Sequence, residues 1–243
     1  MMTEYSWQAR SCRVGAALSS HLPEWGRGLV LCLLVCASAA RAQPDCGMPG
    51  WAEVAVTPSG PICHRAVQDS AQPMVMIAAT LPVGPDRVRD VVTDYDHFAE
   101  FIPYLQESRV LARDGTRQWV YHRLRFPAPV AERAYVISSS ETAGDRQRAM
   151  RIEWRLSTRT FVDIDTGGAV RPDRLEGFWD LRPRAEGNAT EARYAVLSEP
   201  GGLLPEWLVT RLTDRYVQQV MAAVRERCLM EAFNSTWLWG PAW

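Results

Sequence analysis

The sequence contains no lysine, and all 27 of its basic residues are arginine. We interpret this bias as the codon usage of a GC-rich genome, with selection for bidentate anion contacts as the alternative. The 28 acidic residues offset the arginines, which leaves a net charge of −1. Because proteins that bind nucleic acids display an excess of positive charge, this balance predicts no nucleic-acid partner.

Long apolar runs are also missing, except for one near the N-terminus. Residues 29–40 read LVLCLLVCASAA, and Ala40-Arg41-Ala42 has the A-x-A form of a cleavage site. The run is too short to span a bilayer and is typical of a secretory signal peptide. We therefore expect cleavage after Ala42 and a mature protein that is secreted or periplasmic. A lipoprotein anchored at Cys36 is the alternative, and it is disfavoured because Val35 is not small.

Cysteine is scarce in the chain after residue 42, which contains only Cys46, Cys63 and Cys228. In an oxidising compartment Cys46 and Cys63 are predicted to form a disulfide, which contributes up to about 3 kcal/mol in the chain-entropy model. Cys228 is expected to be a buried free thiol. The spacing fits no zinc pattern and the chain has no phosphate-binding loop, so we expect no metal and no cofactor.

One amphipathic helix dominates the C-terminal part of the chain. Pro205 occupies a position suited to the first turn, and no glycine or proline follows from Glu206 to Glu231. Apolar residues recur there at helical spacing, which predicts a single helix of roughly 40 Å. The apolar stripe consists of Leu208, Val209, Leu212, Tyr216, Val217, Val220, Met221, Val224 and Cys228.

The chain before this helix is rich in alternating apolar segments, which predict strands. Two short helices, over residues 85–94 and 95–105, interrupt them. A curved antiparallel sheet packed on one long helix leaves a cavity between the two, so we expect an α+β fold with an internal binding site. The predicted strands are 51–56 and 62–67 (a small hairpin), 73–81, 108–112, 118–126, 134–141, 150–156, 161–165, 174–181 and 191–198.

Three motifs in this layout resemble those of the START-like superfamily, also called SRPBCC or polyketide cyclase-like. The stretch PDRVRDVVTDYDHFAEFIPYLQESRVL from Pro85 is similar to the early helices of this family. Residues 177–183 have the form G-x-W-x-L-x-P, and residues 200–208 have the form P-G-G-x-L-P-x-W-L. The resemblance implies the helix-grip fold, in which the sheet wraps around the C-terminal helix.

The resemblance also implies a division of the chain and a function. We expect an N-terminal extension over residues 43–68, a START-like domain over 69–232 and a tryptophan-rich tail over 233–243. The tail would close the cavity, touch a membrane transiently, or pack in an outer groove. The family implies a carrier of lipids or other hydrophobic molecules, and in some branches a cyclase or dehydratase.

A ligand site in this fold requires apolar walls and a few polar groups that orient the ligand. The alternative is a filled core without a usable cavity, as in a non-catalytic interaction module. We expect aromatic residues of the strands, the apolar stripe of the long helix and the second short helix to contribute the walls. The candidate ligand-binding residues are Phe101, Ile102, Tyr104, Trp119, Tyr121, Trp154, Trp179, Tyr194, Leu208, Leu212 and Tyr216.

An enzyme of the aromatase/cyclase kind would require at least two titratable side chains that converge in the cavity. The sequence contains no convincing pair, and no Ser-His-Asp or Cys-His arrangement can be argued from it. We therefore assign no catalytic residue. The acid–base candidates considered are His97, His122, Arg133, Asp163, Asp165 and Glu176.

Overall fold

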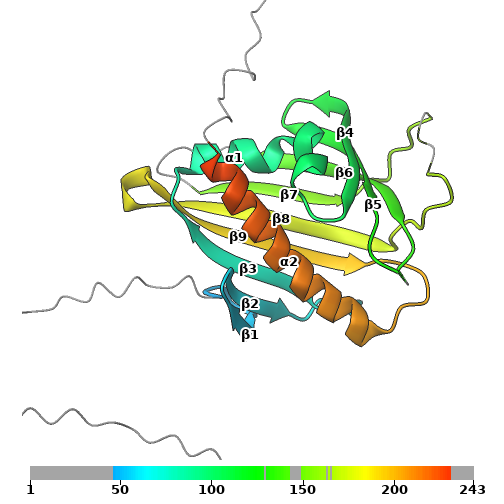
Figure 1. Ribbon diagram of the computed structural model, residues 1–243, viewed down its shortest axis with the longest axis horizontal. Helices are drawn as coiled ribbons and strands as arrows, with labels where there is room; N and C mark the ends of the chain where they lie inside the picture. Colours follow the sequence, from blue (N-terminus) through cyan, green and yellow to red (C-terminus); the bar gives the residue numbers. More distant parts are fainter. Residues whose placement is uncertain (1–45, 129, 143–148, 163, 165, 231–243) are drawn as a thin grey trace, which may run out of the picture. The chain divides into compact units, whose positions relative to one another are not determined.

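The computed structural model describes residues 46–230 except 129, 143–148, 163 and 165, so the predicted signal peptide and tail lie outside the described residues. Within them, nine strands form one antiparallel sheet in the order β1-β2-β3-β9-β8-β7-β6-β5-β4 (Figure 1). The strands are β1 (Ala52–Thr57), β2 (Gly60–Arg65), β3 (Met74–Leu81), β4 (Leu105–Asp114), β5 (Arg117–Leu124), β6 (Arg133–Thr142), β7 (Met150–Leu156), β8 (Arg174–Arg184) and β9 (Ala189–Glu199). The helices are α1 (Pro85–Thr93), α2 (Glu206–Leu229) and the 3₁₀ helices η1 (Tyr95–Glu100) and η2 (Ala185–Gly187).

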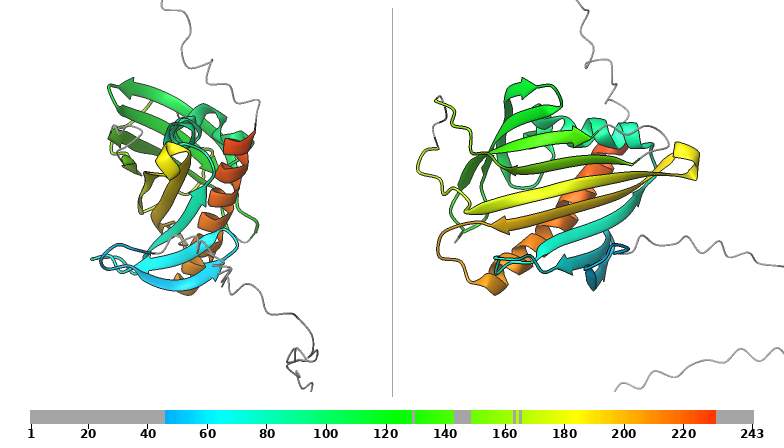
Figure 2. Two further views of the ribbon diagram at one scale, coloured as in Figure 1. Left: turned by 90° about the vertical axis from the view of Figure 1, so that its left-hand side faces the viewer. Right: turned by 180° about the vertical axis from the view of Figure 1, so that it is seen from behind.

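The long helix α2 crosses one face of the curved sheet obliquely (Figures 1 and 2). It packs against β3, β9 and α1, so the sheet has an inner face toward α2 and an outer face away from it. The core between sheet and helix includes Val217, Val220, Met221 and Val224 of the predicted stripe. This arrangement confirms the predicted α+β helix-grip fold.

The ends of α2 are set by residues outside it. Pro205 is the N-cap, next to the position that suits a residue without an amide hydrogen. At the other end, the Arg87 guanidinium of α1 donates hydrogen bonds to the carbonyls of Cys228 (3.2 Å) and Met230 (3.0 Å). A cation is favourable there because the last carbonyls carry partial negative charge. The Cys228 thiol is free and buried, and burial raises its pKa to about 12.

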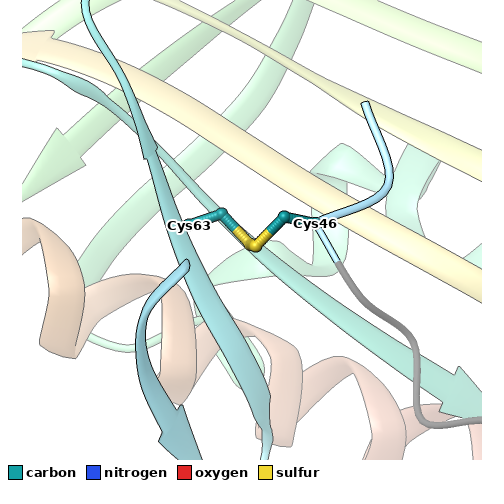
Figure 3. The surroundings of a disulfide bond; sticks show 2 residues. All are labelled: Cys46 and Cys63. Atoms are coloured by element: carbon teal, nitrogen blue, oxygen red, sulfur yellow. A yellow bond between two sulfur atoms is a disulfide. The ribbon is translucent and has the colours of Figure 1, made fainter. Parts of the chain in front are cut away.

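The β1–β2 hairpin continues the sheet beyond β3. Ile62 pairs with Ile77 and Cys63 with Met76, so residues of the predicted N-terminal extension belong to the same sheet as the domain. Cys63 is joined to Cys46 by a disulfide with a Cα–Cα distance of 5.9 Å (Figure 3). This bond fixes the segment before β1 against the outer face of the sheet, where Cys46 and Cys63 share a small apolar cluster with Phe178.

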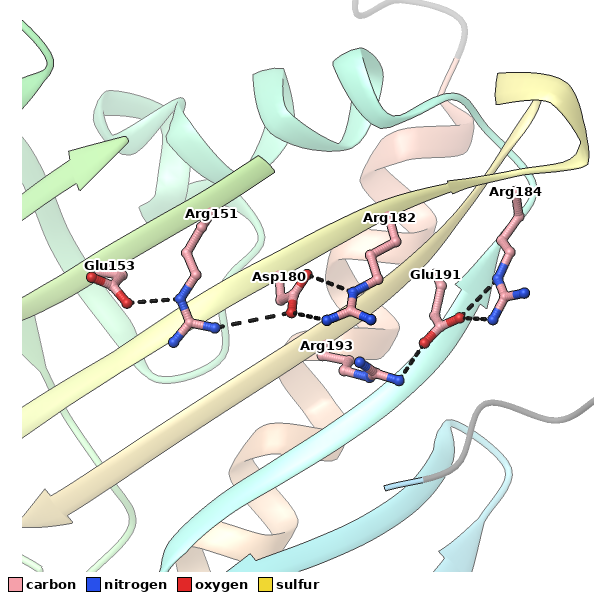
Figure 4. Close-up of polar contacts among 7 residues, drawn as sticks. All are labelled: Arg151, Glu153, Asp180, Arg182, Arg184, Glu191 and Arg193. Carbon is pink, nitrogen blue, oxygen red and sulfur yellow. Dashed lines mark hydrogen bonds and ion pairs between the residues drawn. The ribbon is translucent and has the colours of Figure 1, made fainter. Parts of the chain in front are cut away.

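The outer face of β7, β8 and β9 carries a row of ion pairs (Figure 4). Arg182 and Asp180 are 3.1 Å apart, and Arg193 and Glu191 are 2.6 Å apart. Oε2 of Glu191 also accepts two hydrogen bonds from the Arg184 guanidinium. The carboxylates of Asp180 and Glu191 are buried and matched by arginines, while Nε and Nη1 of Arg193 have no partner among the described residues.

Two predicted elements differ from the structure. The second short helix ends at Glu100 rather than Leu105, because Pro103 has no amide to donate and Tyr104 adopts a left-handed φ of 63°. Residues 161, 162 and 164 of the predicted 161–165 strand are not in a strand. The chain pairs instead at Val170, which forms an isolated bridge with Arg133.

Candidate ligand-binding site

An apolar cavity of about 80 Å³ lies between the inner face of the sheet and α2. One water molecule requires about 10–15 Å³ measured in this way, so the space holds more than a single water. Strands β4 to β9, α1, η1 and α2 all contribute to its walls. The aliphatic lining residues are Val92, Ile102, Leu105, Ile137, Leu175, Val196, Val220 and Val224.

Three aromatic rings stack along one wall of this cavity. The Tyr194 ring packs between two indoles, with centroids 4.6 Å from Trp179 and 5.7 Å from Trp154 and interplanar angles of 30° and 25°. Gly177 of β8 pairs with Trp154 of β7. A Cβ at this glycine would lie 2.5 Å from Cζ2 of Trp154, so the missing side chain provides the space that the indole fills.

His122 brings a polar group to the same cavity from β5. The rings of Tyr95, Phe98 and Tyr135 surround its imidazole at centroid distances of 6.4, 6.2 and 5.7 Å. Its Nε2 has no hydrogen-bond partner among the described residues. Burial lowers the pKa of His122 to about 4, so the imidazole is neutral at pH 7 and offers one donor and one acceptor nitrogen.

Three tyrosines, Tyr135, Tyr194 and Tyr216, also line this cavity. Burial raises the pKa of each hydroxyl, and the charge of an ionised Tyr216 would raise the pKa of the other two further. The hydroxyls therefore lie close enough to influence one another, and none of them bonds to a described residue. Tyr95 differs, because its hydroxyl lies 2.7 Å from Oγ of Ser139.

A second apolar cavity, of about 100 Å³, adjoins the first near the start of α2. Both cavities are lined by Tyr135, Leu175, Val196 and Tyr216, so side chains alone separate them. Arg133 supplies a cation to the second cavity, and within the described part of the chain it bonds only to carbonyls, those of Ala131, Pro200 and Gly201. Burial lowers the pKa of Arg133.

We compared the chain with known protein families, related sequences and solved structures. Residues 81–225 match the family model described as "Polyketide cyclase / dehydrase and lipid transport". The chain belongs to this family. An uncharacterized protein of Pseudomonas aeruginosa, PA1579, is 32% identical over 103 residues, which are 42% of this chain and 48% of that protein. The match thus spans about half the length of that relative.

Solved structures with the same fold include a STAR-related lipid transfer protein of Xanthomonas axonopodis. It has a TM-score of 0.66 and 24% identity, covering 74% of this chain and 99% of that one. Human STARD10 has a TM-score of 0.66 and 16% identity, covering 78% and 82%. At these identities the likeness concerns the fold. The family match and the two apolar cavities indicate that the chain is a hydrophobic ligand-binding domain.

Six of the ligand-binding residues predicted from the sequence line one of the two cavities. Those in the first cavity are Ile102, Trp154, Trp179, Tyr194 and Tyr216, and Leu212 lies in the second with Tyr216. They come from a loop, three strands and α2, so the fold brings together residues that lie up to 114 positions apart in the chain, from Ile102 to Tyr216.

The other predicted residues lie elsewhere. Trp119 and Tyr121 were expected on the concave side, but they belong to an apolar cluster on the outer face. The physical reason is strand alternation, because Val120 and Leu124 of β5 join the inner core. Three more lie beside the cavities without lining them. Phe101 packs against Phe98, Tyr104 against Phe126, and Leu208 is half-buried on α2.

The acid–base candidates are scattered. His122 and Arg133 lie in different cavities, while His97 is exposed and pairs with Asp94 at 2.7 Å. Glu176 accepts from Arg174 at 2.7 Å on the outer face. Asp163 and Asp165 lie outside the described residues. Among the described residues, no group of three or more potential ligands could hold a metal ion.

Sequence reasoning missed Tyr95, Phe98 and Tyr135 as cavity residues. A signal for Tyr135 exists in hindsight, because it pairs with His122 across β5 and β6 and both therefore face the same side. Tyr95 and Phe98 lie on η1, whose orientation depends on its packing against β4.

No helix of the described region combines the length and apolarity that crossing a membrane requires.

Proposed function

We propose that the protein is an exported carrier or sensor that holds a lipid or another hydrophobic molecule in these cavities. The observation that carries the proposal is the pair of adjoining apolar spaces between sheet and α2. Movement of side chains such as Tyr216 would join them into one longer site. Sheltering apolar surface there stabilises a complex by roughly 25 cal/mol per Å², and the family description includes lipid transport.

Export is supported by the disulfide between Cys46 and Cys63. Structural disulfides form and persist in oxidising compartments such as the periplasm, and they are rare in the cytosol. This bond agrees with the predicted signal peptide over residues 1–42. Both features support a protein that acts outside the cytoplasm.

Transient contact with a membrane is supported by the loop before α2 and by the first turn of that helix. Leu203 and Trp207 are 104% and 66% exposed, and they flank Leu204, which lines the second cavity. Exposed tryptophan and leucine side chains favour the membrane–water interface. A ligand entering near the start of α2 would then pass directly from the bilayer to an apolar site.

The aromatase/cyclase alternative is less well supported by the titratable groups. General acid–base catalysis is most efficient when the pKa of the group lies near the working pH. Burial moves the pKa of His122 down to about 4 and raises those of Tyr135 and Tyr194. These neutral groups suit the binding of a ligand better than the transfer of protons.

Native mass spectrometry of protein purified from the periplasm tests the proposal, followed by extraction and identification of bound lipids. We expect a co-purifying hydrophobic molecule at near one-to-one ratio. Leu212→Glu should lower that ratio, because it puts a charge into the second cavity. The matched control is Leu229→Glu, which changes an exposed leucine of the same helix that lines neither cavity. A ligand-free mass that persists with a lipid panel would overturn the proposal.

A further inference from the structure

The first cavity carries polar groups but no charge. Its described lining residues include no arginine, aspartate or glutamate. His122 is neutral at pH 7, and the tyrosine hydroxyls are protonated. Transfer of an ionised carboxylate or ammonium into such surroundings costs far more than transfer of an uncharged polar group. The cavity therefore disfavours a ligand whose buried end is ionised.

The same cavity contains hydrogen-bonding groups that the protein leaves unused. Nε2 of His122 is buried without a partner among the described residues. The hydroxyls of Tyr135, Tyr194 and Tyr216 likewise bond to none of them. A buried polar atom without a partner, such as Nε2 of His122, lowers the stability of the protein, so native structures seldom retain one. A ligand or ordered water that satisfies them recovers this cost.

The unused groups differ from the polar groups that have a structural role nearby. The Tyr95 hydroxyl is satisfied by Ser139, and Ser108 donates to the Tyr95 carbonyl. His122 and Tyr135 are cross-strand partners, and Tyr216 approaches from α2 on the opposite wall. Their polar atoms are therefore presented to the cavity from both the sheet and the helix that covers it.

We infer that the first cavity receives an uncharged hydroxyl or carbonyl oxygen of the ligand, and that His122, Tyr135 and Tyr216 hydrogen-bond to it. A hydroxyl suits the site because it both donates and accepts, as do the phenols and the neutral imidazole. The apolar remainder of the ligand extends along the Trp154–Tyr194–Trp179 stack and into the second cavity. This inference rests on the proposed function and specifies the end of the ligand that enters first.

Three probes of similar shape test the inference: hexylbenzene, 4-hexylphenol and 4-hexylbenzoate, titrated calorimetrically into the delipidated protein at pH 7.5. We expect the phenol to bind more tightly than the hydrocarbon by about fivefold for each hydrogen bond gained, and the ionised benzoate to bind most weakly. Equal affinity for phenol and hydrocarbon, or benzoate binding as tightly as phenol, would overturn the inference while leaving the proposed function standing. If none of the three binds, the inference is overturned, and native mass spectrometry with the lipid panel decides the proposed function separately.

Variants then identify the groups responsible. His122→Phe and Tyr135→Phe should reduce the preference for phenol over hydrocarbon by about fivefold each, while hexylbenzene affinity stays the same and shows that the cavity is intact. Tyr121→Phe is the matched control, because its buried hydroxyl has no partner among the described residues and lies on the outer face. A preference that survives in both cavity variants, or one that falls equally in the control, would contradict the assignment.

Discussion

The inner and outer faces of the sheet carry different kinds of buried polar groups. On the outer face of β7 to β9, the buried carboxylates of Asp180 and Glu191 are matched by arginines (Figure 4). On the inner face, His122 Nε2 and the Tyr135 hydroxyl have no partner among the described residues. The carboxylates lie on β8 and β9 and the unpaired groups on β5 and β6, and strand alternation sends each to its face because successive side chains point to opposite sides.

This difference between the faces implies that the outer face contributes to the stability of the fold and the inner face to ligand binding. The buried carboxylates on the outer face are paired with arginines within the protein, so they require no ligand. On the inner face, the buried and unpaired Nε2 of His122 costs stability until something binds to it. We therefore expect substitutions on the outer face to change the free energy of unfolding, and those on the inner face to change ligand affinity.

The largest effect is expected for Glu191→Gln on the outer face. Glu191 is buried and pairs with Arg184 and Arg193, and loss of its charge removes the carboxylate with which buried Arg193 pairs. Breaking a buried pair by removing one partner costs about 3–5 kcal/mol, which urea denaturation would measure. The folded variant should bind the hydrophobic probes as the parent does, and a loss of binding would show that the two faces are not independent.

Acid should destabilise the protein through the inner face. The folded-state pKa of His122 is about 4, below the ordinary value of about 6.5. Between these values the unfolded chain binds a proton that the folded protein does not, so the free energy of unfolding falls as the pH falls. The loss approaches about 3 kcal/mol by pH 4 and is absent above pH 6.5.

His122→Phe isolates this contribution, because phenylalanine does not titrate. The difference in stability between parent and variant should change by about 3 kcal/mol between pH 7 and pH 4, as followed by denaturation at several pH values. A constant difference would mean that the imidazole is solvated, and the inner face would then not be the uncharged site that we describe.

The sequence predicts the fold better than it predicts the site. Alternation identified the inner residues of β7 and β8, such as Trp154 and Trp179, because their two faces differ sharply in polarity. On β5 the alternation is ambiguous, since Trp119 and Tyr121 on one face are as apolar as Val120 and Leu124 on the other. Which face turns inward is decided by how the sheet curves around α2, a tertiary effect that no local pattern carries.

Gly177→Ala should have an intermediate effect on stability, and it tests whether the inner face forms the wall of the ligand site. The new Cβ would lie 2.5 Å from Trp154 Cζ2 and 2.3 Å from the Ala195 carbonyl oxygen. Overpacking of this kind costs about 1–3 kcal/mol, and the displaced indole should also weaken hexylbenzene binding. Gly115→Ala is the control for probe binding, because no atom lies within 4 Å of its Cβ position, and its φ of 55° strains an alanine through the backbone alone. Unchanged hexylbenzene affinity in Gly177→Ala would mean that the stack does not form the ligand wall.

The smallest expected effect is the difference in stability between two tyrosine-to-phenylalanine variants in the same cavity. Tyr95→Phe removes the hydroxyl that bonds to buried Ser139, which should cost about 1–2 kcal/mol in the absence of ligand. Tyr135→Phe removes a hydroxyl without a protein partner and should change stability by less than about 0.5 kcal/mol. Urea denaturation of the delipidated variants gives both values. Equal costs would indicate that water already satisfies Tyr135, and a ligand oxygen would then have to displace that water to bind.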